Sequence, residues 1–145
     1  MKIESAASAE HHQLIEIWEA SVRATHDFLA ERDLIELKPL ILNEYFKAVS
    51  LSVAKREDGQ ILGFCGVSDG NIEMLFVAPQ ARGQGVGALL AQHAISTEGG
   101  TKVDVNEQNA QALGFYKHLG FRVIGRSPVD GQGKPYPLLH MQLAR

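Results

Sequence analysis

The chain has 145 residues, of which 45% are hydrophobic and 21% are charged, and its formal net charge is −3. This composition argues against disorder and predicts a single domain over residues 1–145. One cysteine cannot form an internal disulfide, and neither a membrane-spanning apolar stretch nor a leader segment is visible, so we expect a cytoplasmic protein. Without an excess of basic residues, we expect neither nucleic acid nor a membrane as partner.

The first half of the chain changes from helical to strand-like hydrophobic spacing. In chain order the patterns predict a strand at 2–5, helices at 8–25 and 31–46, and strands at 49–53, 60–67 and 71–77. Pro39 lies inside the second helix and should kink it or split it. The turn at Asp58-Gly59 and the one at 68–70 predict that the last three strands form an antiparallel meander.

The second half continues with alternating helices and strands. Here the patterns predict a helix at 88–96, a strand at 101–105, a helix at 106–119, and strands at 121–124 and 138–143. Gly120 is the expected helix cap. The whole order predicts an α/β fold, with a mixed and mostly antiparallel sheet of six to seven strands and about four helices on its two faces.

A glycine-rich loop between the strand at 71–77 and the helix at 88–96 is the most informative feature. Its residues are Arg82, Gly83, Gln84, Gly85, Val86 and Gly87. Glycines allow a tight turn and close approach of a ligand, and the following helix adds its unpaired N–H groups and its dipole. Arg82 adds a cation, so the loop predicts a phosphate or pyrophosphate site. A glycine-rich turn without a ligand is the alternative.

Two other nucleotide-binding loops match this one only in part. The Lys-Ser/Thr ending of a nucleoside triphosphatase loop is absent, because an alanine and a leucine follow Gly87. Residues 83–88 fit the loose dinucleotide fingerprint, and Asp104 lies about twenty residues further on. However, residues 78–82 separate the strand from the glycines, and the motif starts past the midpoint of the chain. Too little chain therefore follows for the parallel βαβ units of a dinucleotide fold.

The loop and a second motif together resemble the GNAT superfamily of N-acetyltransferases. The first family signature is Arg or Gln, two residues, Gly, one residue, and Gly or Ala, which Arg82, Gly85 and Gly87 satisfy after the fourth predicted strand. The second is matched by Asn106-Glu107-Gln108-Asn109, followed by Gly114-Phe115-Tyr116 and Gly120-Phe121. The element order agrees along the whole chain. The resemblance therefore implies a GNAT-like fold and one N-acetyltransferase domain over residues 1–145.

The family's co-substrate is acetyl-CoA, and the resemblance implies where it binds. The N–H groups of residues 82–87 would hold the pyrophosphate. The main chain of Phe76 and Val77 would pair with the pantetheine arm as one strand pairs with another. The N–H of Leu75 would point at the thioester carbonyl and stabilise the oxyanion of the tetrahedral intermediate.

The second motif is expected to complete the site. A kink or bulge near Asn106 would separate the two central strands for the thioester. Asn109 matches a position that contacts the CoA arm, although it also suits the cap of the next helix. Tyr116 occupies the place of the family's acid tyrosine, which protonates the leaving thiolate. The alternative is that Tyr116 is a core aromatic, but Phe115 is the better core residue by type.

A general base is harder to assign. Some family members carry a glutamate at the position of Asn71, and Glu73 lies two residues further on. Period-two alternation puts Glu73 on the face shared by Asn71, Leu75 and Val77, where its carboxylate would accept the amine proton directly or through water. The alternatives are that Glu73 is an exposed strand residue, or that water carries the proton without a dedicated base.

Three further residues are candidates for the acceptor side: His26, where the first two helices meet, and Tyr136 and His140, near the last strand. A helix cap or a surface pair is the plainer interpretation of His26. Cys65 lies in an apolar strand, which favours a small core residue over a nucleophile. Six scattered histidines without ligand spacing predict no metal site.

The expected function is an N-acetyltransferase that moves the acetyl group of acetyl-CoA to a primary amine by direct attack in a ternary complex. The acceptor would be a small molecule or a peptide, and the enzyme a monomer or a homodimer. The alternative from another class is a sensor module that binds acetyl-CoA or CoA without turnover.

Overall fold

The structure, a computed structural model, describes residues 1–144. It divides into two compact units, the first comprising residues 1–100 and the second the residues from Thr101 onward. One domain over residues 1–145 stays a prediction.

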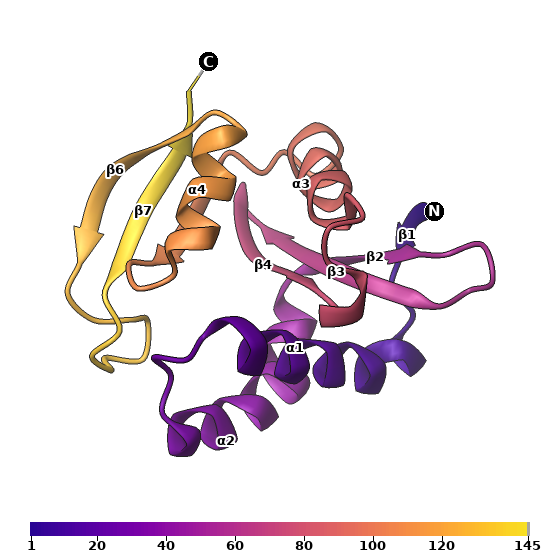
Figure 1. Ribbon diagram of the computed structural model, residues 1–145, viewed down its shortest axis with the longest axis horizontal. Coiled ribbons are helices and arrows are strands. Elements are labelled where there is room, and N and C mark those ends of the chain that lie inside the picture. Colours follow the sequence, from indigo (N-terminus) through magenta and orange to yellow (C-terminus); the bar gives the residue numbers. More distant parts are fainter. Residues whose placement is uncertain (145) are drawn as a thin grey trace. The chain divides into compact units, whose positions relative to one another are not determined.

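The first unit contains a four-stranded antiparallel meander and three α-helices (Figure 1). Its elements are β1 (Lys2–Ser5), α1 (His11–Thr25), α2 (Glu31–Leu40), β2 (Ser50–Lys55), β3 (Ile61–Ser68), β4 (Asn71–Val77) and α3 (Val86–Ser96). Gly59 has a φ of 90° in the β2–β3 turn, a backbone conformation that favours glycine. Every predicted element of this half is present, but several bounds differ. A 3₁₀ turn (Ser8–Glu10) precedes α1, α2 ends earlier than predicted, β2 is shifted towards Lys55, and α3 begins two residues earlier.

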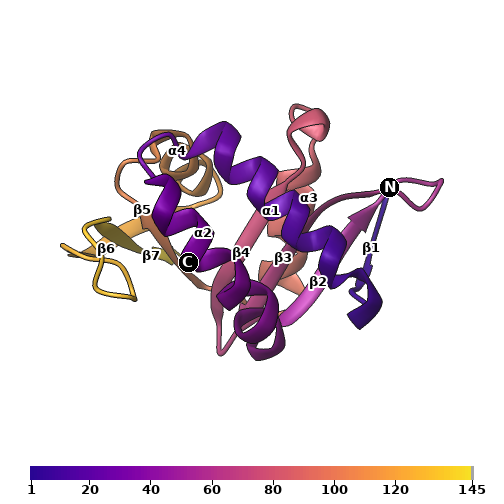
Figure 2. The ribbon, with the colours of Figure 1, turned by 90° about the horizontal axis from the view of Figure 1, so that it is seen from below.

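Helices cover both faces of this sheet (Figure 1 and Figure 2). α1 packs on β3 and β4, whereas α3 packs on the opposite face of β2, β3 and β4. On β2, Val53 belongs to the core cluster of α1, and its neighbour Ser52 faces His93 of α3 at 3.0 Å. The cluster under α1 and α2 comprises Leu14, Ile15, Trp18, Val22, Leu34, Ile41, Phe46, Leu51, Val53, Ile61, Phe64 and Met74.

A β-bulge interrupts β4 at Glu73. The successive β3 residues Gly66 and Val67 lie opposite positions 74 and 72 of β4, so Glu73 is the extra residue. Residues before and after a bulge no longer alternate in phase between the two faces of the sheet. The sequence pattern contains no glycine or proline at this position, and the bulge was not predicted.

The second predicted helix changes its geometry rather than splitting at Pro39. α2 continues through Pro39 to Leu40, and a π-helical turn (Ile41–Tyr45) and a 3₁₀ turn (Phe46–Ala48) follow. Proline removes one backbone donor and crowds the preceding turn, and the change of helix type two residues later is consistent with that strain. Ile41 and Phe46 still reach the core.

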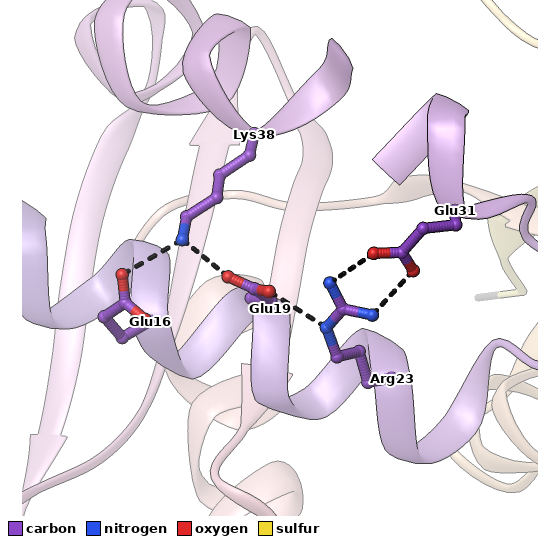
Figure 3. Close-up of polar contacts among 5 residues, drawn as sticks. All are labelled: Glu16, Glu19, Arg23, Glu31 and Lys38. Carbon is purple, nitrogen blue, oxygen red and sulfur yellow. Dashed lines mark hydrogen bonds and ion pairs between the residues drawn. The ribbon is translucent and has the colours of Figure 1, made fainter. Parts of the chain in front are cut away.

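Ion pairs join α1 to α2 (Figure 3). Arg23 of α1 donates two hydrogen bonds to the carboxylate of Glu31, at 2.7 and 2.9 Å, and one to Glu19 at 2.9 Å. Lys38 of α2 donates to Glu19 and, at 3.1 Å, to Glu16. The bonds from Lys38 and then from Arg23 hold the pKa of Glu19 below its usual value. The network links the two helices, although ion pairs between exposed side chains each add little to stability.

The second unit is a three-stranded antiparallel sheet with one helix. Its elements are β5 (Lys102–Asn106), α4 (Ala110–His118), β6 (Phe121–Ser127) and β7 (Leu138–Leu143), with β7 paired to both other strands. α4 packs on β5 and β6. Gly120, with a φ of 102°, follows the end of α4 as predicted.

The predicted helix start at Asn106 is wrong. Asn106 ends β5 instead of opening a helix, because Asn109 is the residue that caps α4. The β5–β7 pairing runs through Asn106 without a register shift, and the kink predicted between the two central strands stays a prediction. In the strand that precedes the glycine-rich loop, a bulge lies at Glu73.

Candidate functional site

The glycine-rich loop forms an exposed entry into α3. Gly83 and Gly85 have φ angles of 81° and 82°, and Gly85 is the N-cap of α3. The first helical bond runs from the N–H of Leu89 to the carbonyl of Gly85, at 3.0 Å. The N–H groups of Val86, Gly87 and Ala88 therefore lie in the first turn, where a helix has no acceptor of its own. A Cβ on Gly83 or Gly85 would meet no atom within 4 Å, so these glycines are required by conformation and leave the loop open to a ligand.

The side chains of the loop leave its N–H groups accessible. Arg82, Gln84 and both left-handed glycines are exposed, whereas Val86 is buried beneath them. The Gln84 amide donates to the carbonyl of Gln80, at 3.4 Å, which closes the turn on the side away from the helix. An exposed arginine beside aligned N–H groups can bind an anion such as a phosphate.

β4 offers a row of main-chain groups on the edge away from β3. The Ala78 N–H donates to the Leu62 carbonyl at 2.8 Å, so this pair is hydrogen-bonded. In an antiparallel ladder every second pair is hydrogen-bonded. Phe76 lies two residues before Ala78, so its main-chain N–H and C=O are also hydrogen-bonded to β3. The N–H and C=O groups of Leu75 and Val77 point away from β3. The main chain of Phe76 is therefore not the group that could pair with a pantetheine arm, contrary to the prediction, whereas Leu75 and Val77 remain candidates.

Glu73 faces a different side from the one predicted. It lines a cavity of about 390 Å³ together with Met74 and Phe76, which lie on the α1 and α2 face of β4. The bulge breaks the alternation, so Glu73 does not share the face of Leu75 and Val77. Its carboxylate is exposed and accepts a hydrogen bond of 3.3 Å from the amide of Asn71.

Tyr116 and Asn109 belong to the second unit. Tyr116 is buried in α4, with its ring 5.5 Å from that of Phe121 and 5.1 Å from that of Phe115. Phe115 is only half-buried, so the expectation that it is the better core residue of the two is wrong. Asn109 caps α4, because its side-chain oxygen accepts the N–H of Ala112 at 3.1 Å. The capping role is confirmed, and the role toward CoA stays a prediction.

His140 is held on β7 by two side chains from neighbouring strands. Its Nδ1 lies 2.6 Å from Asp104 Oδ1 of β5, and its Nε2 lies 2.7 Å from Ser127 Oγ of β6. Gly125 lies opposite His140 and leaves room for the ring, because a Cβ at this position would lie 3.5 Å from the imidazole. The two hydrogen-bond partners fix the orientation of the His140 ring. The sequence suggested neither of them, because the strand register determines which residues are neighbours. Tyr136, also a predicted acceptor residue, is buried two residues before β7.

His26 ends α1 as its C-cap. Its Nδ1 lies 2.7 Å from the Thr25 hydroxyl, and the centre of its ring lies 5.2 Å from that of Phe28, with the two planes tilted by 43°. Burial lowers the pKa of His26, which outweighs the opposing effect of Asp27 and favours the neutral imidazole. Within residues 1–144, His26 is not among the residues that line the cavity at Glu73. The capping interpretation fits this surrounding, and the acceptor role stays a prediction.

Cys65 is a core residue, as predicted. It is fully buried in β3, and burial raises the pKa of its thiol to about 12. At pH 8 only about one thiol in 10⁴ is therefore ionised, and the sulfur is shielded as well. We expect native protein to resist iodoacetamide at pH 8 and urea-unfolded protein to be alkylated completely, as followed by mass spectrometry. Equal rates in both states would contradict this placement.

Residues 1–144 contain no group of three or more His, Cys, Asp or Glu side chains arranged to hold a metal ion. No helix in this part of the chain is long and apolar enough to span a bilayer.

Comparisons with known proteins agree with these observations. Residues 36–144 match the acetyltransferase (GNAT) domain family. The peptidyl-lysine N-acetyltransferase YjaB of Salmonella typhimurium is 43% identical over 141 residues, which are 97% of each chain. The solution structure of apo YjaB from Escherichia coli, 44% identical, superposes with a TM-score of 0.88 and covers 99% of this chain and 97% of that one.

A more distant structure also shares the fold. It is that of yncA from Salmonella typhimurium with its cofactor acetyl-CoA, at 21% identity and a TM-score of 0.68, covering 100% of this chain and 95% of that one. The predicted GNAT-like α/β fold and the enzyme class are confirmed, and the similarity to YjaB extends over nearly the whole chain. The chain belongs to the GNAT acetyltransferase family and is an N-acetyltransferase.

Proposed function

We propose that the chain transfers the acetyl group of acetyl-CoA to the side-chain amine of a lysine in a peptide. The single observation that carries the donor half is the open loop at residues 82–87, which leads aligned N–H groups into α3. The acceptor half is supported by the relative of 43% identity, a peptidyl-lysine N-acetyltransferase. A small-molecule amine, which the sequence leaves equally open, is the alternative acceptor.

The loop suits a pyrophosphate for three reasons. The left-handed backbone at Gly83 and Gly85 turns peptide N–H groups outward, the helix dipole of α3 places partial positive charge at the same end, and Arg82 supplies a full charge. A neighbour of the same fold binds acetyl-CoA, which supports this ligand. Gln84, Val86 and Gly87 contribute through their main chain rather than through their side chains.

Beyond the loop, β4 would hold the thioester end. The outward N–H and C=O of Val77 would pair with the amide groups of the pantetheine arm, as another strand would. The outward N–H of Leu75 would donate to the thioester oxygen as it becomes an oxyanion, and would stabilise the transition state. A contact of Asn109 with the arm is implied only by the family resemblance and stays a prediction.

The proton transfers would involve Glu73 and Tyr116. A lysine amine has a pKa near 10.4, so it must lose a proton before it attacks the carbonyl carbon. The exposed Glu73 carboxylate would draw the ammonium to β4 and accept its proton directly or through water. Tyr116 would give its phenolic proton to the CoA sulfur as the carbon–sulfur bond breaks, leaving an acetylated lysine and free CoA.

Replacement of Gly85 by alanine tests the backbone requirement. A φ of 82° costs a residue with a Cβ about 1 kcal/mol, so the unfolding free energy should fall by about that amount. Relaxation of the loop would turn its N–H groups away, and we expect acetyl-CoA to bind about tenfold more weakly by titration calorimetry. Gly59→Ala is the matched control, because Gly59 has a φ of 90° in a turn far along the chain. Gly59→Ala should lose a similar amount of unfolding free energy while its affinity for acetyl-CoA stays unchanged. If both variants bound acetyl-CoA with equal affinity, the role of Gly85 would be contradicted.

The function as a whole is tested by binding followed by turnover. Saturating acetyl-CoA should raise the melting temperature, because a ligand that binds only the native state stabilises it, while NAD should not. Arg82→Ala should weaken binding about tenfold, and Arg56→Ala, an exposed arginine of the β2–β3 turn, should not. Lysine peptides, polyamines, amino acids and aminoglycosides are then compared by release of free CoA thiol. Binding without turnover on any amine would favour a sensor module instead.

A further inference from the structure

A mostly apolar cavity lies beside Glu73 in the first unit. Its volume is about 390 Å³, and its walls come from α1, α2, the π-helical turn and β4. Six side chains define it: Trp18, Leu37, Ile41, Tyr45, Met74 and Phe76. The only ionisable carboxylate among its lining residues is that of Glu73. The mechanism above uses Glu73 but leaves the rest of this cavity without a role.

Two irregularities of the backbone create the cavity. The bulge in β4 turns Glu73 to the same face as Met74, so a carboxylate stands next to an apolar wall. The π-helical turn brings both Ile41 and Tyr45 to the cavity; Ile41 is buried there and Tyr45 is exposed at the rim. Such turns interrupt an otherwise regular helix at an energetic cost and are frequent at functional sites.

The remaining walls come from two helices that are joined to each other. Trp18 of α1 is buried, and the ion pairs of Arg23 and Lys38 link α1 to α2, which supplies Leu37 (Figure 3). A preformed apolar cavity binds an apolar group without first paying to order its walls. A cavity of this size therefore suits one large side chain of a ligand.

The distribution of charge decides how a ligand would lie. Glu73 is exposed, whereas Trp18 and Ile41 are buried, so the carboxylate stands at the opening and the apolar surface lies deeper. A lysine inserted ammonium-first would carry its charge past Glu73 into the apolar interior, which is costly. A ligand with an ammonium at the opening and an apolar group in the interior would match both the carboxylate of Glu73 and the apolar walls.

We propose that this cavity selects peptides in which the acceptor lysine is next to a large apolar residue, whose side chain fills the cavity while the lysine ammonium lies beside Glu73. This inference rests on the proposed function and names its substrate class. Adjacent residues have Cα atoms about 3.8 Å apart, which lets one peptide reach both places. Leu75, two residues from Glu73 on β4, is about 7 Å further along the strand, within reach of a lysine side chain.

The test compares matched peptides of the form acetyl-Gly-X-Lys-X-Gly-amide, with X as Phe, Leu, Ala or Glu. Removal of a phenyl group from water favours Phe over Ala, and we expect kcat/KM to be at least tenfold higher for Phe. The peptide with X as Glu should have a lower kcat/KM than the peptide with X as Ala, because it would bring a second carboxylate close to Glu73. Phenethylamine is included as a free amine with the same apolar group.

Variants connect the preference to the cavity. Ala48, which lines the cavity, is replaced by phenylalanine, and the ratio of Phe to Ala peptides should fall to about one. Ile35→Phe is the matched control, because Ile35 is 59% exposed on α2 and does not line the cavity, and it should keep the full ratio. If Ala48→Phe fails to fold, Ser68→Leu narrows the same cavity from the end of β3.

Each outcome has a definite meaning. This inference is overturned if the ratio of kcat/KM for the Phe and Ala peptides is near one in the unaltered protein, or if that ratio is unchanged in both cavity variants. Either result leaves the acetyltransferase function in place. Phenethylamine used more than tenfold better than every peptide also overturns this inference, since the cavity would then hold a small amine. Acetylation of no amine at all would contradict the proposed function itself.

Discussion

Replacement of Tyr116 by phenylalanine is expected to lower kcat by about 10²-fold, because a positioned general acid contributes at least that factor. The ring is buried against Phe121 and would keep its contacts, so the affinity for acetyl-CoA should change by less than about twofold. Release of CoA thiol at saturating peptide gives kcat, and titration calorimetry gives the affinity. This split separates an acid from a residue that merely supports the fold.

The pH dependence of this variant provides a second measurement. Loss of a general acid should change the shape of the pH profile of kcat, whereas loss of a core contact would lower kcat equally at every pH. Urea unfolding checks that the variant is folded. Unchanged kcat in a folded Tyr116→Phe protein would remove Tyr116 from the mechanism.

Phe64→Ala is expected to cause the largest loss of stability, about 3–5 kcal/mol in the free energy of unfolding. Phe64 is completely buried at the centre of the first unit, and its ring lies 5.7 Å from the rings of both Phe46 and Phe76. Its removal leaves a cavity under α1 and withdraws support from Phe76, which lines the proposed peptide pocket. Urea unfolding of the two proteins measures the difference.

The matched control for this loss is Val129→Ala. Val129 is 40% exposed in the loop before β7, and its truncation should change stability by less than about 0.5 kcal/mol. A loss below about 1 kcal/mol for Phe64→Ala would mean that the aromatic cluster does not organise the core.

Hydrophobic spacing was enough to predict most elements of the fold. β1 and β4 were predicted to the residue, because short turns and proline mark their ends. The helix at 31–46 was only approximately right, since helical periodicity does not distinguish an α-helix from one that ends in a π-helical turn. Local spacing also cannot reveal the bulge at Glu73, which is defined by the register with β3.

The candidate site was predictable where a motif specifies backbone conformation. Glycines at 83 and 85 are required by their positive φ angles, so the loop is readable from the chain. The face of the sheet on which Glu73 lies could not be predicted, because one extra residue in β4 changes the phase of the alternation. The partners of His140 were also hidden, since Asp104 and Ser127 lie 36 and 13 residues away and meet only through strand pairing.

The most direct test of the account is a mass balance on one reaction with acetyl-CoA and a lysine peptide flanked by phenylalanine. The account predicts one acetyl group on the lysine side chain, located by fragmentation, for each CoA thiol released, with both products slowed together by Arg82→Ala. Thiol released without acetylated lysine, or no thiol released from bound acetyl-CoA, would contradict it.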